Sequence, residues 1–164
     1  MGFFDVVKKR CSVREYNGRP VDRNVLESMV DAGRRAPTAR GEEPWEFIVV
    51  VDKKKLAVLA DITDHGRFLK DAQAAIIIVC RETKYYLEDG CAATENILLT
   101  ATDLGVGSCW IAGDKKPYAA SIMQCLNIPS GYKLVSIIAL GYPKDGFIPH
   151  HKRALQEVLH WEQF

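Results

Sequence analysis

A run of seven apolar residues from Ala74 to Cys80, with three isoleucines in a row, limits the possible folds more than any other segment. β-Branched side chains favour extended backbone, so we expect a strand over 75–80. Similar patterns predict a buried strand over 47–51 and further strands over 108–111 and 134–140. The apolar run is far shorter than the roughly 20 residues of a membrane-spanning helix. We therefore expect no membrane partner.

Apolar residues at helical spacing lie between these strands. Helices are expected over 2–9, from Asp22 to before Pro37, over 55–61, over 88–104 and over 118–126. Asp22 is a suitable N-cap, and Pro37 disfavours helical backbone at the residue before it. The 88–104 helix is apolar around most of its circumference, which places it inside the protein or across a subunit interface. Strands separated by helices indicate an α/β or α+β sandwich rather than a helical bundle.

The size and charge of the chain indicate one domain without a nucleic-acid partner. Its 164 residues are 48 % apolar and 26 % charged, and no repeat, low-complexity stretch or linker divides them. Lysine and arginine total 22 against 21 acidic residues. Proteins that bind phosphate backbones typically carry a basic surplus, so this balance argues against nucleic acid.

The last residues, about 149–164, are expected to form a tail that docks on its own subunit or on a partner. Beyond Pro149 the chain is too apolar to stay in solvent. The residues that make it so are Leu155, Val158, Leu159, Trp161 and Phe164.

The N-terminus and the cysteines predict a cytoplasmic protein. Met1 to Asp5 show no cationic segment followed by a long apolar one, as a secretory signal would. The cysteines are Cys11, Cys80, Cys91, Cys109 and Cys125. Their odd number, wide spacing and lack of a Cys-x-x-Cys pair favour reduced thiols over a disulfide framework or a zinc site.

Three short patterns resemble functional motifs, and each has a simpler explanation. Gly105-Val106-Gly107 closes a helix and leads into a strand, which is the reverse of a dinucleotide-binding turn. The pair His150-His151 lacks a further ligand at zinc-type spacing, so no metal site is expected. Glu88-Asp89 lie where a helix begins, where acidic residues are expected to cap it.

The segment from Arg10 to Arg14 is the most informative candidate site. In an extended backbone side chains alternate, so Arg10, Ser12 and Arg14 would lie on one side. Two guanidinium groups with a hydroxyl between them fit an anion. Spacing alone favours a solvated basic face over an anion site. Spacing alone also cannot connect this segment with the basic group 151–153 or with the small-residue loop 36–41.

Taken together and in order, these segments resemble the nitroreductase family of FMN-dependent oxidoreductases. The similarity runs over nearly the whole chain. Arg10 to Tyr16 is similar to the family's opening Arg-x-Ser-x-Arg/Lys-x-aromatic stretch, and 36–47 to its Ala-Pro-Ser-x-x-Asn-x-Gln-Pro-Trp-x-Phe signature. The stretch 89–111 is similar to its central helix and following strand, and 141–143 with 153–158 to its close.

The resemblance implies a homodimer of α+β three-layer sandwiches, each with a central mixed or antiparallel sheet flanked by helices. One FMN would lie in each interface crevice, and the tail would pack on the partner subunit of a single-domain chain, 1–164. Matched by position, the cofactor-binding residues are Arg10, Cys11, Ser12, Arg14, Pro37, Thr38, Ala39, Gly41, Trp110, Ile111, Ala112, Gly113, His151 and Arg153.

The family also implies a role for each of these groups. Arg10, Ser12, His151 and Arg153 would hold the phosphate and ribityl chain, and Arg14 would face the ribityl chain or the pyrimidine edge. Residues 37–39 would approach FMN from the partner subunit. Residues 110–113 would run beside the ring, with a backbone amide near Ala112 contacting N5. No side-chain acid or base is expected to be catalytic.

The resemblance implies two half-reactions at one flavin face. NAD(P)H would deliver hydride and leave, and a nitroaromatic, quinone or similar small-molecule acceptor would then take it. A relative that catalyses dehydrogenation or dehalogenation, a flavin protein for storage or sensing, and a flavin-free interaction domain are the alternatives. The sequence departs from the signature at Gly41, in place of Asn, and at Glu43, in place of Gln, and the stretch 62–71 is short for a lid.

Overall fold

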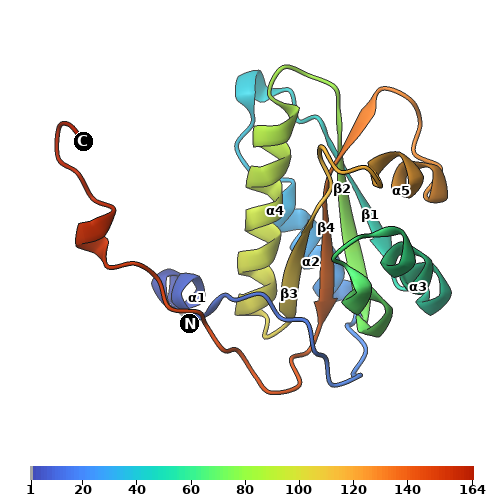
Figure 1. The fold of residues 1–164 in the computed structure, drawn as a ribbon, viewed down its shortest axis with the longest axis horizontal. Helices are drawn as coiled ribbons and strands as arrows, with labels where there is room; N and C mark the ends of the chain where they lie inside the picture. Colours follow the sequence, from blue (N-terminus) through green and yellow to red (C-terminus); the bar gives the residue numbers. More distant parts are fainter. Residues whose placement is uncertain (1) are drawn as a thin grey trace.

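The computed structural model describes residues 2–164 and arranges them as a four-stranded sheet with helices on both faces (Figure 1). The sheet order is β1-β2-β4-β3, and each neighbouring pair is antiparallel. The strands are β1 (Trp45–Val50), β2 (Ala74–Arg81), β3 (Gly107–Ala112) and β4 (Tyr132–Gly141). This architecture confirms the predicted α+β three-layer sandwich.

Most helix ends lie within two residues of the predicted positions. They are α1 (Phe3–Lys9), α2 (Arg23–Gly33), α3 (Lys53–Ile62), α4 (Tyr86–Asp103) and α5 (Ala119–Cys125). Three short 3-10 turns are η1 (Ala39–Gly41), η2 (Arg67–Asp71) and η3 (Leu155–Glu157). None of the helices within residues 2–164 combines the length and apolar character needed to cross a membrane.

The two central strands explain the apolar run that dominates the sequence. Residues 74–80 of β2 are all buried, as are 134–141 of β4, and the two strands pair with Ile77 opposite Ile137. Helices α2 and α4 cover one face of the sheet, and α3, η2 and α5 cover the other. Because both faces of the sheet are covered, the side chains that point to either face must be apolar.

The strand expected over 47–51 is real, but the prediction that it is buried was wrong. It runs over 45–50 as β1, at the edge of the sheet, where Val49 is 41 % exposed. Val51 lies outside the strand. A β-branched run indicates extended backbone, but the position of a strand in the sheet depends on its pairing partners.

Helix α4 lies very close to the centre of the sheet because it carries a glycine there. A Cβ on Gly90 would lie 2.7 Å from Val135 Cγ2 and 3.0 Å from Cys80 Sγ. One turn later, Thr94 Oγ1 lies 2.8 Å from Ser136 Oγ, and both residues are buried. These contacts fix the helix against β2 and β4, and β4 is the strand that pairs with β3.

We expect Gly90→Ala to destabilise the protein although alanine is the better helix former. The added methyl group overpacks the contact between α4 and the sheet, at a cost of about 1–3 kcal/mol. That corresponds to a fall of about 2–10 °C in Tm for a chain of this size. Thermal unfolding measures it, with Glu88→Ala at an exposed position of the same helix as the control. An unchanged Tm would contradict the close approach.

The C-terminal tail does not pack against the rest of its own chain. Every residue from Pro149 to Phe164 is exposed, and Figure 1 shows the tail leaving the body beside α1 and extending away from it. The Lys9 ammonium lies 4.5 Å from the centre of the Phe147 ring at the point of departure.

Candidate functional site

The Arg10–Arg14 segment is extended and lies along the start of β3. Ser12 forms a parallel bridge with Ser108, and the Val13 N–H donates to the Ser108 carbonyl at 2.9 Å. Cys11 and Val13 are buried, whereas Arg10, Ser12 and Arg14 are not. The predicted alternation is therefore present, and it places the two arginines and the serine on the outward side.

The two glycines before and within β3 allow this close approach. Gly105 has φ +76° and follows the end of α4, in agreement with the predicted helix stop. A Cβ on Gly107 would lie 2.8 Å from the Val13 side chain. Gly105 therefore ends the helix, as expected, and Gly107 allows the close packing of Val13, which was not predicted.

Arg10 and Arg14 have different surroundings. Arg10 Nε lies 3.8 Å from Glu95 Oε1 of α4, and about a quarter of its side chain is exposed. The Arg14 guanidinium lies over the Phe68 ring of η2, 5.7 Å from its centre. Neither contact uses up the donors of a guanidinium group, so both arginines can still bind an anion.

Arg14 also lines a small cavity beside β3. The cavity has a volume of about 140 Å³. It is lined by Arg14, Asp64, His65, Phe68, Cys109, Trp110, Ile111, Ala112, Lys116 and Tyr118. Three of the predicted residues beside the flavin ring, 110–112, thus lie in one cavity with Arg14.

The outer edge of β3 presents backbone groups next to this cavity. The Gly113 N–H donates to the Val135 carbonyl at 3.1 Å, so Gly113 faces β4. In an antiparallel pair the inward-facing groups alternate, so the N–H groups of Trp110 and Ala112 point away from β4. The Tyr118 hydroxyl donates to the Ala112 carbonyl on that edge. The exposed edge can therefore donate hydrogen bonds to a flat ligand.

Burial favours the neutral forms of a thiol and a hydroxyl next to β3. Burial raises the pKa of the Cys109 thiol, although Arg14 lowers it, and burial also raises the pKa of the Tyr118 hydroxyl. In β2, burial likewise raises the pKa of Cys80, to about 12. Because the thiolate is the nucleophile, these raised values agree with Cys80 and Cys109 as packing residues.

The loop with Pro37, Thr38 and Ala39 lies at the other end of the molecule. The Ala39 N–H donates to Asp89 Oδ1 at 3.0 Å, near the start of α4. Ser12 pairs with β3, which follows the far end of that helix. Residues 89 and 103 are 14 positions apart, or about 21 Å along a helix axis. One chain therefore does not bring this loop to the Arg10–Arg14 segment (Figure 1).

The same loop explains why the signature Asn is replaced by glycine. Gly41 has φ +67°, a left-handed conformation that glycine and asparagine adopt more readily than other residues. A Cβ there would meet nothing within 4 Å. Arg40 and Glu43 also have positive φ, 61° and 44°, which costs about 1–3 kcal/mol each. Such a strained loop needs contacts that hold it.

His151 and Arg153 are not brought to the other predicted phosphate ligands. Both are exposed in the tail, where Arg153 Nη2 donates to the Glu157 carbonyl at 2.7 Å. Their assignment to the cofactor stays a prediction. Within residues 2–164, no cluster of three or more histidine, cysteine or acidic side chains is arranged to hold a metal ion.

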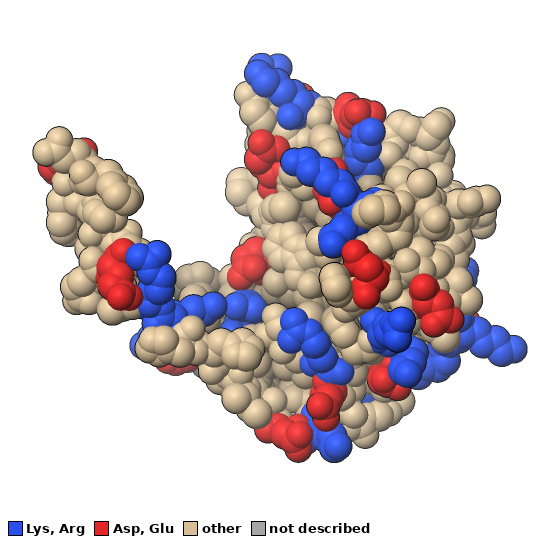
Figure 2. All heavy atoms as spheres, viewed as in Figure 1, with Lys and Arg blue, Asp and Glu red and all other residues tan. Residues whose placement is uncertain are grey.

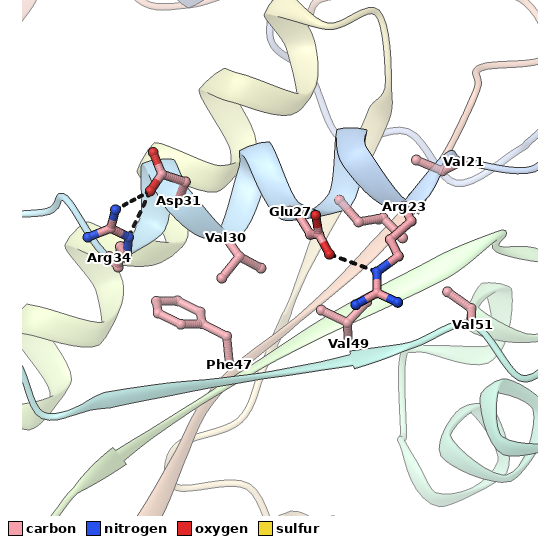
Figure 3. A pocket seen from close by; sticks show the side chains of 10 residues that line it. Val21, Arg23, Glu27, Val30, Asp31, Arg34, Phe47, Val49 and Val51 are labelled. Atoms are coloured by element: carbon pink, nitrogen blue, oxygen red, sulfur yellow. Dashed lines mark hydrogen bonds and ion pairs between the residues drawn. The ribbon is translucent and has the colours of Figure 1, made fainter.

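A larger cavity, on another part of the surface, contains none of the predicted site residues. It has a volume of about 780 Å³ and lies between α2 and β1, where Val30, Phe47 and Val49 line it (Figure 3). Ion pairs at its rim, such as Arg23 with Glu27 at 2.7 Å, are already satisfied. An apolar groove without convergent polar groups is better suited to contact with another protein segment than to catalysis.

Four residues with a place in this geometry were missed by the sequence analysis as site residues. Phe68 lies in the stretch that was noted only for its shortness, and Tyr118 precedes a helix that carried no motif. Asp89 lies in the first turn of α4, as expected of an acidic residue at a helix start, but its carboxylate accepts the Ala39 N–H rather than capping its own helix. Asp89 and Glu95 both lie in a matched stretch, but no local pattern marked either one as a site residue.

Charged side chains of both signs are mixed over the surface. Figure 2 shows lysine and arginine interspersed with aspartate and glutamate on the face in view. The positive character of the site is therefore a local property of Arg10 and Arg14.

Comparison with known proteins agrees with this geometry. A family model described as "Putative TM nitroreductase" matches residues 3–164. A protein of Archaeoglobus fulgidus named "Putative NADH dehydrogenase/NAD(P)H nitroreductase" is 36 % identical over 148 residues, which cover 85 % of this chain and 84 % of that protein.

Two solved structures show the same fold. A protein of Parabacteroides distasonis, also named "Putative NADH dehydrogenase/NAD(P)H nitroreductase", superposes with a TM-score of 0.93 at 30 % identity. The superposition covers 99 % of this chain and 98 % of that one. A nitroreductase of Bacteroides fragilis with bound FMN superposes with a TM-score of 0.82 at 25 % identity, covering 99 % and 100 %.

Proposed function

This chain belongs to the nitroreductase family of FMN-dependent oxidoreductases, and on that premise we propose that it passes reducing equivalents from NAD(P)H through FMN to a nitroaromatic, quinone or similar small acceptor. The observation that carries the proposal is the outward row of Arg10, Ser12 and Arg14 beside the free edge of β3. An anion-binding row next to an edge of hydrogen-bond donors matches the two ends of FMN.

The residues present fit both parts of that cofactor. A phosphate dianion is best bound by charge-assisted hydrogen bonds, which the Arg10 guanidinium and the Ser12 hydroxyl can donate, and Arg14 would face the ribityl chain or the pyrimidine edge. Ser108 Oγ, in the residue that bridges Ser12, is buried without a hydrogen-bond partner among residues 2–164. The isoalloxazine ring needs an apolar wall with a few donors, which Trp110 and Ile111 and the edge amides supply.

When bound, FMN supplies the two-electron redox chemistry, and the protein supplies binding, orientation and electrostatics. Arg14 places a fixed positive charge in the cavity beside β3, where it would stabilise negative charge on a reduced ligand. The Ala112 N–H would donate a hydrogen bond to a ring atom at the β3 edge. Phe68 and Trp110 would exclude water from the reacting face. No side chain here is assigned as a general acid or base.

The site would be completed by a second copy of the chain. Phe3 and Phe4 of α1 are 69 % and 73 % exposed, and they lie on the side where the tail leaves the body. Such exposed aromatic side chains are typical of a surface that is covered by protein. In a homodimer the partner's 37–41 loop would approach the Arg10–Arg14 row, and each tail would cover apolar surface on the other subunit. We propose that the tail of one subunit covers the groove between α2 and β1 of the other.

The first experiment is the visible absorption spectrum of the purified protein, before and after incubation with FMN, together with its mass in solution. We expect a two-peaked flavin spectrum on a dimer, and oxidation of NADH or NADPH that depends on an added quinone. A flavin-loaded protein without that turnover would indicate a storage or sensing role. A colourless protein that takes up no FMN would overturn the proposal.

A further inference from the structure

Asp89 has a feature that the proposed function does not use. Its side chain is only 5 % exposed, and it carries a carboxylate into the contact between α4 and the 37–41 loop. Oδ1 accepts the Ala39 N–H at 3.0 Å, whereas Oδ2 has no partner among residues 2–164. A buried carboxylate is costly unless it is hydrogen-bonded, so its presence here calls for a reason.

The loop that Asp89 contacts lacks the usual means of fixing its own start. Ala39 is the first residue of η1, and the preceding Thr38 makes no side-chain cap. The Thr38 hydroxyl instead lies 3.5 Å from the Glu43 amide. Asp89, 50 positions away in the sequence, accepts the N–H of the first residue of this turn.

A second side chain holds the other end of the loop. Arg81, at the end of β2, donates from Nη2 to the Glu42 carbonyl at 2.8 Å. Asp89 and Arg81 therefore bracket Arg40 and Gly41, which both have positive φ. The loop is held in a strained shape from outside, by one carboxylate of a helix and one guanidinium of the sheet.

We propose that Asp89 is a positioning residue: through the Ala39 amide it fixes the shape in which the 37–41 loop meets the flavin in the partner's crevice. This inference rests on the proposed function, because it assumes that FMN binds and that the loop acts in the partner's site. Asp89 itself touches no reacting atom.

Three variants test the contact in the full-length protein. Asp89→Ala removes the acceptor and should weaken FMN binding by at least about tenfold, the range for one hydrogen bond to a charged group. Asp89→Asn keeps an acceptor oxygen and should stay within about threefold of the native affinity. Ala39→Pro removes the donor at a position where proline is tolerated, since residue 38 is already extended. The double variant should bind no more weakly than either single one.

Glu88→Gln is the matched control, because it removes the same charge from the neighbouring, exposed position of α4. FMN titration measures each affinity, and thermal unfolding of the apoprotein identifies variants that fail to fold. If Asp89→Ala does not fold, the FMN affinities of Ala39→Pro and Asp89→Asn still test whether Asp89 acts as the acceptor. Native affinity in Ala39→Pro, or equal losses in Asp89→Asn and Asp89→Ala, would overturn the role of Asp89 as an acceptor.

Mixed dimers test whether the loop acts across the interface. One tagged chain carries Asp89→Ala and the other carries Arg10→Ala with Arg14→Ala. If the loop serves the partner's site, one site of the mixed dimer is intact and the other has both defects. We then expect one FMN per mixed dimer at a concentration where both variant homodimers are nearly empty. Two weakened sites, each with the affinity of one variant homodimer, would overturn the inference, whereas a native protein that binds no FMN would instead overturn the proposed function.

Discussion

Replacing Arg10 and Arg14 together by alanine is expected to lower the affinity for FMN by about a hundredfold or more. Each arginine offers charge-assisted hydrogen bonds, and such bonds contribute about 1.5–3 kcal/mol apiece. The two side chains lie on the same outward side of one extended segment, so one FMN can engage both, Arg10 at its phosphate and Arg14 at its ribityl chain or pyrimidine edge. The other candidates for the phosphate are Ser12 and the tail residues His151 and Arg153, and they cannot replace the lost guanidinium groups.

Titration of the apoprotein with FMN, followed by quenching of flavin fluorescence, measures this loss. Arg19→Ala is the matched control, because Arg19 is an exposed arginine close in sequence that stacks on Tyr142, 4.4 Å from the ring centre. We expect the control to bind as the native protein does. The loss should shrink for riboflavin, which has no phosphate. A double variant with native FMN affinity would exclude the Arg10–Arg14 row as the FMN-binding row.

Deleting residues 154–164 is expected to convert the proposed dimer into a monomer at micromolar concentration. The deleted segment carries five exposed apolar side chains, and Trp161 is 78 % exposed in the single chain. Burying such side chains stabilises by about 1.5–3 kcal/mol each. That gain must exceed the entropy lost when two chains associate. Without the tail, the exposed residues of α1 and the groove between α2 and β1 remain uncovered.

Light scattering after size-exclusion chromatography measures the mass of the truncated chain. The deletion begins after Arg153, so it leaves both predicted phosphate ligands of the tail in place. Val30→Arg, inside the groove of Figure 3, tests the receiving surface and should weaken the dimer in the same direction. Glu27→Arg, at the rim of the same groove, would leave the apolar floor intact and is the control. A truncated chain that remains dimeric would exclude the tail as a main contributor.

The elements of this protein could be predicted from local patterns. The isoleucine run, the β-branched run before Asp52 and the apolar spacings of α2 and α4 depend on residues that are close in sequence. The alternation of Arg10, Ser12 and Arg14 is of the same kind, since it follows from an extended backbone alone. Four segments in the order of a known family then indicated the fold and the cofactor.

Only the tertiary structure decided which elements meet. It placed β1 at the sheet edge, brought Phe68 over Arg14, and turned Asp89 from its own helix toward Ala39. It also separated the 37–41 loop from the Arg10–Arg14 row by most of the length of α4. Backbone geometry repeats every few residues and is therefore visible in sequence. Contacts between residues 50 positions apart depend on how whole elements pack, and no local pattern records that packing.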